Sequence, residues 1–246
     1  MKKLLLASVA AAFLSAPAGF AWAQGAAPAQ PADDPPVDWT GFYVGLALGD
    51  DSGTVKVKDL DGYNGPPPFK YSTEGVQAAV QGGYNWWFDP CWLLGLEGEV
   101  GYFGFDGHAQ YPPYVGVRSR ADSVASSEGG LFVTATGRVG LTAGNWLLFA
   151  KGGFAGADIA AAYIDSDPVG TTLVAGTRDT GLRAGYTGGV GLEFMAPSSP
   201  WGARVEFDHY DFGSVTHTAT SFGGTTYRFH HYMTSDAVKF AVTYHL

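Results

Sequence analysis

The last ten residues of the chain, Ala237–Leu246, read AVKFAVTYHL. Every second residue from Val238 to Leu246 is large and mostly apolar, whereas the residues between them are small or polar. A period of two is typical of a β-strand with one apolar face. The pattern runs to the final residue, so we expect this strand to close a barrel against Trp39–Gly49, which has the same alternation.

Six more segments between these two strands share the alternation. They are Glu74–Trp86, Trp92–Phe103, Leu131–Thr142, Trp146–Ala157, Leu182–Phe194 and Trp201–Tyr210. The eight segments predict an all-β fold, an eight-stranded antiparallel transmembrane up-and-down β-barrel over residues 39–246. Trp146–Ala157 is the least regular segment, because Phe149 and Lys151 lie on the same face.

The connections between the segments alternate in length. The short ones are Trp87–Cys91, Ala143–Asn145 and Met195–Pro200. The long ones are Asp50–Thr73, Phe105–Gly130, Asp158–Gly181 and Asp211–Asp236. Short turns at one end and long loops at the other are typical of outer-membrane barrels, whose short turns face the periplasm. We therefore expect four long loops outside the cell.

The residues before the first strand indicate export. Residues 1–23 have a charged start, an apolar run and the ending Ala21-Trp22-Ala23, which together predict a secretory signal peptide. Residues 24–38 are rich in Pro and Ala and predict a flexible periplasmic leader. The net charge of −9 argues against nucleic acid as a partner. Cys91 has no second cysteine to pair with, and we expect it to be a small residue in a turn.

Two sets of residues decide which face of the strands points outward. The first set contains six tryptophans near strand ends, next to the leader or a short turn, as an aromatic belt at one membrane interface predicts. They are Trp39, Trp86, Trp87, Trp92, Trp146 and Trp201. The second set contains acids and bases in equal number on the polar face, which predicts an internal ion-pair network. They are Glu97, Glu99, Glu193, Glu206, Asp208, Arg138, Lys151, Arg183, Arg204 and Lys239.

The charged residues expected inside the barrel limit what it could transport. Isolated buried ions are very costly, so charges inside a barrel must be paired. The interior of an eight-stranded barrel is just large enough for side chains to fill. The ten charged residues, together with Gln77, Gln81 and Asn85, should largely plug it. A wide diffusion pore is not expected, but a narrow or gated path stays open as an alternative.

Two stretches of the chain resemble a known family. Asp38–Gly45, DWTGFYVG, resembles the opening strand of the small Gram-negative outer-membrane β-barrel proteins, of the porin family or OmpA-like transmembrane barrel type. Arg204–Gly213, RVEFDHYDFG, resembles their penultimate strand. The resemblance implies an integral outer-membrane protein that serves envelope integrity or surface interactions, and it supplies no catalytic residues. The peptidoglycan-binding domain of larger relatives is not expected here.

The final strand also resembles the C-terminal signal that the barrel-assembly machinery reads. The positions of this signal are Lys239, Ala241, Tyr244 and Leu246. Ala241 stands where Gly is usual, and Leu246 stands where a terminal Phe is usual, so assembly is expected to be less efficient. The resemblance implies the assembly machinery and periplasmic chaperones as partners, beside outer-membrane lipid and lipopolysaccharide.

Three further features are weaker candidates for sites. His230-His231 is expected in a solvated part of the last long loop, and adjacent residues on a strand would point to opposite sides. Tyr63–Phe69 and Tyr111–Tyr114 are rich in Pro and aromatic residues and are expected to stiffen two loops; binding of an extracellular ligand there is the alternative. His209 and Ser214 lie near an acid, but the deacylase-like His-x-Ser-Asn pattern is missing.

These observations favour one function over two others. The leading hypothesis is a structural outer-membrane barrel that stabilises the envelope and presents its loops. The alternative is a narrow porin for small solutes, and a more distant one is a lipid A-modifying enzyme. No cofactor and no metal site is expected. The sequence names no ligand for the loops.

Overall fold

The barrel is described by a computed structural model that covers residues 37–62, 68–110, 123–165, 181–220 and 224–246. The expected signal peptide and nearly all of the leader lie outside the described residues, as do residues 63–67 and 111–114 of the two Pro-rich loop motifs. In the part of the chain that is described, helices of the length and apolar character needed to cross a membrane are absent.

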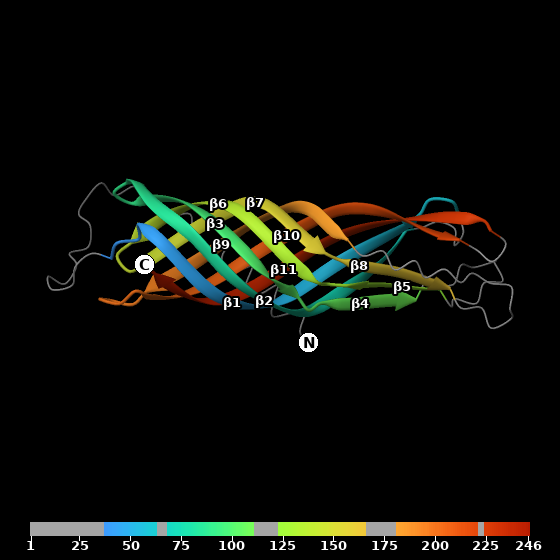
Figure 1. The fold of residues 1–246 in the computed structure, drawn as a ribbon, viewed down its shortest axis with the longest axis horizontal. Helices are drawn as coiled ribbons and strands as arrows, with labels where there is room; N and C mark the ends of the chain where they lie inside the picture. The colour runs from blue at the N-terminus through green and yellow to red at the C-terminus, as the bar shows by residue number, and fades with distance from the viewer. Residues whose placement is uncertain (1–36, 63–67, 111–122, 166–180, 221–223) are drawn as a thin grey trace, which may run out of the picture. The chain divides into compact units, whose positions relative to one another are not determined.

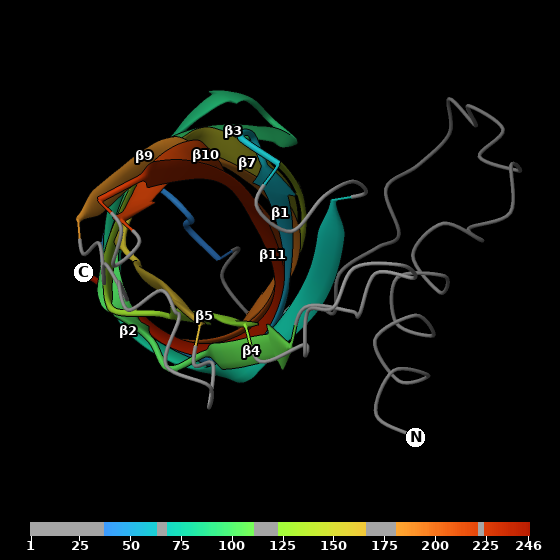
Figure 2. The same cartoon turned by 90° about the vertical axis from the view of Figure 1, so that its right-hand side faces the viewer.

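Eight antiparallel strands form a closed ring, seen from the side in Figure 1 and end-on in Figure 2. They are β1 (Gly41–Asp59), β2 (Phe69–Asp89), β3 (Trp92–Phe103), β6 (Leu131–Ala143), β7 (Trp146–Asp158), β9 (Leu182–Met195), β10 (Trp201–Thr220) and β11 (Thr226–His245). Each strand pairs with its neighbours in the chain, and β1 also pairs with β11. The predicted eight-stranded barrel, closed by its first and last strands, is therefore confirmed.

Three short strands continue the barrel wall beyond the ring. They are β4 (Asp106–Gln110), β5 (Ser123–Glu128) and β8 (Ala160–Asp165). Each follows or precedes a ring strand after a break of one or two residues, and β5 pairs with both β4 and β8. Figure 1 shows these strands at the end opposite the C-terminus. This end carries the long loops and is extracellular by the rule that barrel turns are short on the periplasmic side.

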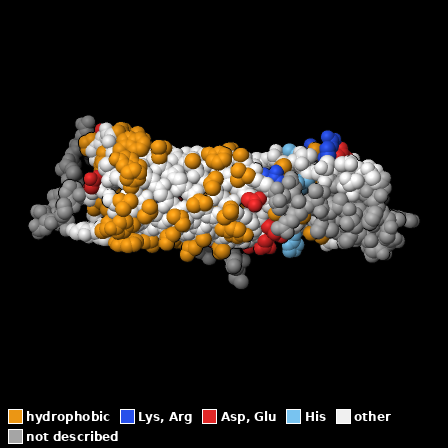
Figure 3. Space-filling view, in the orientation of Figure 1, with side chains coloured by type: hydrophobic (Ala, Val, Ile, Leu, Met, Phe, Trp, Pro, Cys, Tyr) orange, Lys and Arg blue, Asp and Glu red, His pale blue; other side chains and the backbone are white. Residues whose placement is uncertain are grey.

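The strands are longer than predicted. Along a strand the apolar residues change from the outer face to the inner face, and this change hid the second half of the strand from the alternation pattern. On β1 the outer face is apolar from Phe42 to Leu48, and then becomes polar from Asp50 to Lys58. The inner face changes in the opposite sense and ends with the buried Val55 and Val57. The first half matches a strand that faces lipid, and the second half matches a strand that faces water. Figure 3 shows the corresponding band of hydrophobic side chains and its end.

Toward the end of the barrel that carries the long loops, the interior is a conventional apolar core. Phe103 is fully buried and its ring stacks on Phe132 at a centroid distance of 4.2 Å. Tyr210 and Phe212 pack edge-on against the same Phe103 ring. We call this group, with Phe105, Phe229, Met233, Val55 and Val57, the aromatic layer. The long loops predicted at Asp50–Thr73 and Asp211–Asp236 are wrong in large part, because strands cover this core.

A β-bulge in β10 lets the strand follow this change of environment. The pairing of β10 with β11 shifts between Asp211 and Ser214, which leaves one extra residue on β10. Gly213 has a φ of +63°, a left-handed conformation that glycine adopts without strain. The Gly213 N–H donates to Asp211 Oδ1 at 2.8 Å. Before the bulge the even-numbered residues of β10 face inward, and after it the odd-numbered Val215 and His217 do.

The periplasmic mouth is closed by a second, smaller apolar group. Trp39 precedes β1 and is fully buried in this mouth, where its Nε1 donates to the carbonyl of Gly144 at 3.3 Å. Leu93, Leu147, Phe149 and Met195 pack with it. We call these five residues the periplasmic plug. The three short turns predicted at this end are confirmed, and Cys91 lies exposed in the first of them.

Candidate functional site

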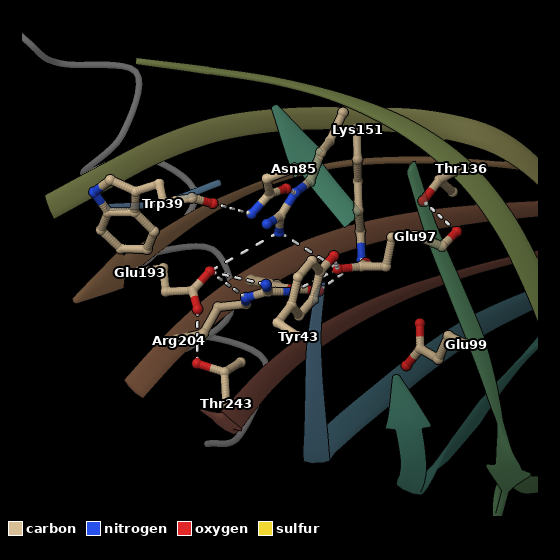
Figure 4. Close-up of polar contacts among 12 residues, drawn as sticks. Trp39, Tyr43, Asn85, Glu97, Glu99, Thr136, Lys151, Glu193, Arg204 and Thr243 are labelled. Atoms are coloured by element: carbon tan, nitrogen blue, oxygen red, sulfur yellow. Dashed lines mark hydrogen bonds and ion pairs between the residues drawn. The ribbon is translucent and has the colours of Figure 1, made fainter. Parts of the chain in front are cut away.

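Between the periplasmic plug and the aromatic layer lies a layer of buried charges, which we call the ionic layer (Figure 4). Strand register brings the charges together. Arg138 on β6 is opposite Lys151 on β7. Glu97 on β3 is opposite Thr136, which is two residues before Arg138 on the same face of β6. The layer consists of Glu97, Glu99, Arg138, Lys151, Glu193, Arg204, Glu206, Asp208 and Lys239. Each of these side chains is at most 2 % exposed.

Arg204 on β10 contacts three carboxylates of the ionic layer. Its Nη1 lies 2.6 Å from Glu97 Oε2 and 2.9 Å from Glu206 Oε1. Its Nη2 lies 2.8 Å from Glu193 Oε2, and its Nε donates to the same oxygen at 3.0 Å. The planar guanidinium thus joins carboxylates from three strands, which a lysine ammonium with a single nitrogen would do less well.

Two lysines supply the other positive charges that pair with the acids of the ionic layer. Lys151 Nζ lies 2.6 Å from Glu206 Oε2 and 3.2 Å from Glu97 Oε1. Lys239 Nζ donates to both oxygens of Glu99 at 2.9 Å and lies 2.7 Å from Asp208 Oδ2. Carboxylates therefore surround each ammonium, as a buried charge requires.

Arg138 is held mainly by neutral groups. Its Nε donates to Asn85 Oδ1 at 2.8 Å, whereas its Nη1 is 3.5 Å from Glu97 Oε2. Its guanidinium carbon lies 4.3 Å from the centre of the Tyr43 ring and 5.3 Å from that of Phe149. Such cation–π contacts explain why Phe149 shares the inner face with Lys151.

Several members of this site were not assigned a role from the sequence. Tyr43 donates its hydroxyl proton to Glu97 Oε2 at 2.6 Å, and Gly83 leaves room for its ring. Thr243 donates to Glu193 Oε1 at 2.7 Å, and His245 Nε2 lies 3.0 Å from the same oxygen. The alternation had placed Tyr43, Thr243 and His245 on the polar face of their strands, but it gave them no partners.

Nine of the ten predicted network residues lie in the ionic layer, and Arg183 does not. Arg183 faces inward on β9, but its register partner is Ala157, near the end of β7 and six residues beyond Lys151. There it lines a cavity with Phe212 and His231. The prediction put all ten inward charges into one ion-pair network, but alternation carries no information on the level of each charge along the barrel axis. The predicted Gln77 and Gln81 lie buried in the lumen.

Four of the six tryptophans of the predicted aromatic belt lie on the outer surface of the barrel. Trp92, Trp146 and Trp201 are about half exposed, and Trp86 lies partly exposed on the same outer surface. Trp39 was predicted wrongly, since it fills the lumen as part of the periplasmic plug. Trp87 also points inward and packs against this plug, because its register partner is the inward-facing Leu93.

His230 and His231 lie on β11 and not in a solvated loop, so that prediction is wrong. They do point to opposite sides: His231 is buried inside, with its ring 4.7 Å from that of His217, and His230 is on the outer face. In the described residues, groups of three or more side chains that could hold a metal ion are absent.

The four positions of the predicted assembly signal divide between the two faces of β11. Lys239 and Ala241 are buried in the lumen, whereas Tyr244 and Leu246 face outward at the periplasmic end. Recognition of these residues by the assembly machinery stays a prediction.

A closed ring of eight antiparallel strands with an apolar outer belt and a charged lumen defines an integral outer-membrane β-barrel. The chain belongs to the family of the outer membrane protein beta-barrel domain, which matches residues 5–245. It is 28 % identical over 224 residues to a 31 kDa outer-membrane immunogenic protein of Brucella melitensis, covering 87 % of this chain and 88 % of that protein. The protein of the same name from Brucella suis matches equally well.

The solved structures give a likeness in fold. The outer membrane protease OmpT of Escherichia coli matches with a TM-score of 0.50 at 9 % identity, covering 83 % of this chain and 96 % of that one. At this identity the likeness concerns the fold alone. The protein is thus an outer-membrane β-barrel protein with a buried ion-pair network in its lumen.

Proposed function

We propose that this protein is a sealed, structural barrel that strengthens the outer membrane and holds its loops away from the surface. The observation that carries the proposal is the series of buried side chains along the lumen. A fully buried Trp39 fills the periplasmic mouth, the ionic layer fills the next level, and the stacked Phe103 and Phe132 fill the one above. Side chains occupy the space that a solute would need.

The part of the barrel beyond the membrane supports the second half of the proposal. Paired strands and an apolar core continue past the outer belt to Val57 on β1 and Phe229 on β11. A core of this kind makes the extension stiff, so that it would carry the loops at a fixed height. The proposal assigns no enzymatic activity to the chain.

A deletion strain of the Gram-negative host tests this function. Loss of the protein should raise sensitivity to detergents and release of membrane vesicles, and the wild-type chain should restore both. Arg204→Met, expected to destabilise the barrel, should restore them poorly at equal expression. A strain with an intact envelope but impaired uptake of small hydrophilic solutes would overturn the proposal in favour of the narrow porin.

A further inference from the structure

A further buried acid lies between the ionic layer and the aromatic layer. Asp51 faces the lumen on β1 and is 1 % exposed, and its Oδ2 accepts a hydrogen bond from Ser235 Oγ at 2.6 Å. Its Oδ1 is buried and has no hydrogen-bond partner among the described residues. Within the same residues, Asp51 also has no Lys, Arg or His nitrogen within 4.0 Å, in contrast to the acids of the ionic layer. An isolated buried carboxylate is costly, so its charge must be compensated.

The base that lies next to Asp51 by register is already engaged elsewhere. Asp51 is opposite Ala237 on β11, and Lys239 is two residues along the same face of that strand. Its Nζ turns away from Asp51 and lies 2.9 Å from Glu99 Oε2 and 2.7 Å from Asp208 Oδ2. Lys239 therefore serves the ionic layer and leaves Asp51 without a cation.

The charge count of the lumen leads to the same conclusion. The ionic layer contains five carboxylates and four Lys or Arg side chains. His245 Nε2 lies 3.0 Å from Glu193 Oε1 and supplies a fifth positive charge when the imidazole is protonated. Asp51 is an additional acid above this balance, so compensation for its charge has to come from a bound cation or from a proton.

Neutral oxygen atoms lie around Asp51 on both neighbouring strands. Thr73 on β2 and Ser235 on β11 are both paired with Gly53, two residues beyond Asp51 on the same face of β1. A Cβ at Gly53 would clash with Thr73 Oγ1 and lie 3.5 Å from Ser235 Oγ, so both hydroxyls face the space over this glycine. Thr73 Oγ1 is buried without a hydrogen-bond partner among the described residues. The same holds for both amide atoms of Gln77, which flanks Asp51 on the other side along β2.

This set of groups fits a hard cation of single charge. Hard cations bind carboxylate, carbonyl and other oxygen ligands. Groups of three or more His, Cys, Asp or Glu side chains, which hold transition metals and other multiply charged ions, are absent from the described residues. Around Asp51 a single carboxylate is combined with neutral oxygens, and the number of charged ligands helps to set which cation a site holds. One negative charge among neutral oxygens matches Na⁺.

We propose that Asp51, Thr73 and Gln77 bind a buried Na⁺ ion between the ionic layer and the aromatic layer. The ligands are Asp51 Oδ1, Thr73 Oγ1 and the amide oxygen of Gln77. The Ser235 hydroxyl positions the carboxylate through its hydrogen bond to Oδ2. The ion joins β1 to β2 and completes the charge balance of the lumen. It needs no continuous channel, because it can be captured as the barrel folds.

Reversible urea unfolding of the refolded chain in uncharged lipid vesicles tests the proposal. The medium contains either Na⁺ or choline, a cation too large for the site, at equal ionic strength and pH. A ligand that binds only the folded state raises the ratio of folded to unfolded protein. With a dissociation constant of about 10 mM, Na⁺ at about 100 mM should raise this ratio about tenfold in the wild type. Asp51→Asn should abolish the difference between Na⁺ and choline.

Two further variants serve as controls. Asp50→Asn removes the same charge from the adjacent residue, which is exposed on the outer face, and should keep the full Na⁺ effect. Thr73→Val removes one neutral ligand and should reduce the Na⁺ effect while the carboxylate stays in place. An unboiled gel shift verifies that each variant is folded.

Three results would overturn the proposal. Equal stability of the wild type in Na⁺ and in choline would mean that a proton compensates Asp51. An equal Na⁺ effect in Asp51→Asn would place the cation elsewhere in the protein. A response of the wild type to Ca²⁺ but not to Na⁺, at equal ionic strength, would overturn the assignment to a cation of single charge.

Discussion

The ionic layer and the aromatic layer fill successive levels of the same barrel. The first is made of charged side chains, and the second is apolar. Around Arg204 the lumen is charged while the outer face meets lipid, and from Phe103 to Val57 the lumen is apolar while the outer face changes from apolar to polar. The polarity of each face is therefore set by the medium outside the barrel. Where lipid takes the apolar side chains, the small lumen must be filled with polar groups that satisfy each other.

The two layers also differ in how they resist change. The ionic layer holds together by pairing, so removing one partner leaves a buried charge without compensation. The aromatic layer holds together by shape, so removing one ring leaves a cavity that its neighbours partly refill. Substitutions in the two layers therefore distinguish the two mechanisms.

The largest effect is expected at the centre of the ionic layer. Arg204→Met replaces the guanidinium side chain by a shorter apolar one and leaves Glu97, Glu193 and Glu206 close together with less positive charge. The free energy of unfolding should fall by roughly 3–5 kcal/mol. Urea unfolding in lipid vesicles, followed by tryptophan fluorescence, measures it. Lys58→Met on the outer face is the control, and a variant as stable as this control would break the comparison.

A smaller loss in the free energy of unfolding is expected in the aromatic layer. Phe103→Ala removes a fully buried ring that contacts Phe132, Tyr210 and Phe212. Such truncations cost about 3 kcal/mol, with the exact loss set by how far the site collapses. The same urea experiment applies, with Leu60→Ala, at an exposed residue just after β1, as control. Phe103→Leu should recover part of the loss, since a cavity and not a charge is at issue; no recovery would contradict a shape-based core.

The smallest effect is expected at the β-bulge between the two layers. Gly213 has a positive φ and open space where a Cβ would lie, so Gly213→Ala meets strain but no clash. The expected loss is about 1 kcal/mol. Gly137→Ala is the matched control, because this strand glycine also has open space but no positive φ. Equal losses at the two positions would show that the backbone of the bulge is not under this constraint.

Alternation was enough to predict the ring of strands, its closure by the first and last strands, and the lumen-facing charges. It did not predict the extension, because the pattern changes phase: Val55 and Val57 are apolar where Leu46 and Leu48 would predict polar residues. The Thr54–Lys58 alternation was a signal for this continuation. The level of Arg183 and the contact of His245 with Glu193 depend on strand register and stagger, which a single-strand pattern does not contain.

Trp39 shows a second limit of prediction from the alternation pattern. Its position next to the leader resembled that of a belt tryptophan, but it precedes the first ring strand and folds inward over the mouth. A residue outside the strands has no alternating face, so its direction followed from packing with Leu93 and Leu147 and not from any period in the sequence.

The closure of the lumen is tested most directly by single-channel conductance of the refolded mature chain in a planar bilayer, with folding verified by an unboiled gel shift. The periplasmic plug, the ionic layer and the aromatic layer together predict no steady current. A steady, ion-selective current through the wild-type barrel would contradict the account, because it would require a continuous path past Trp39, Arg204 and Phe103.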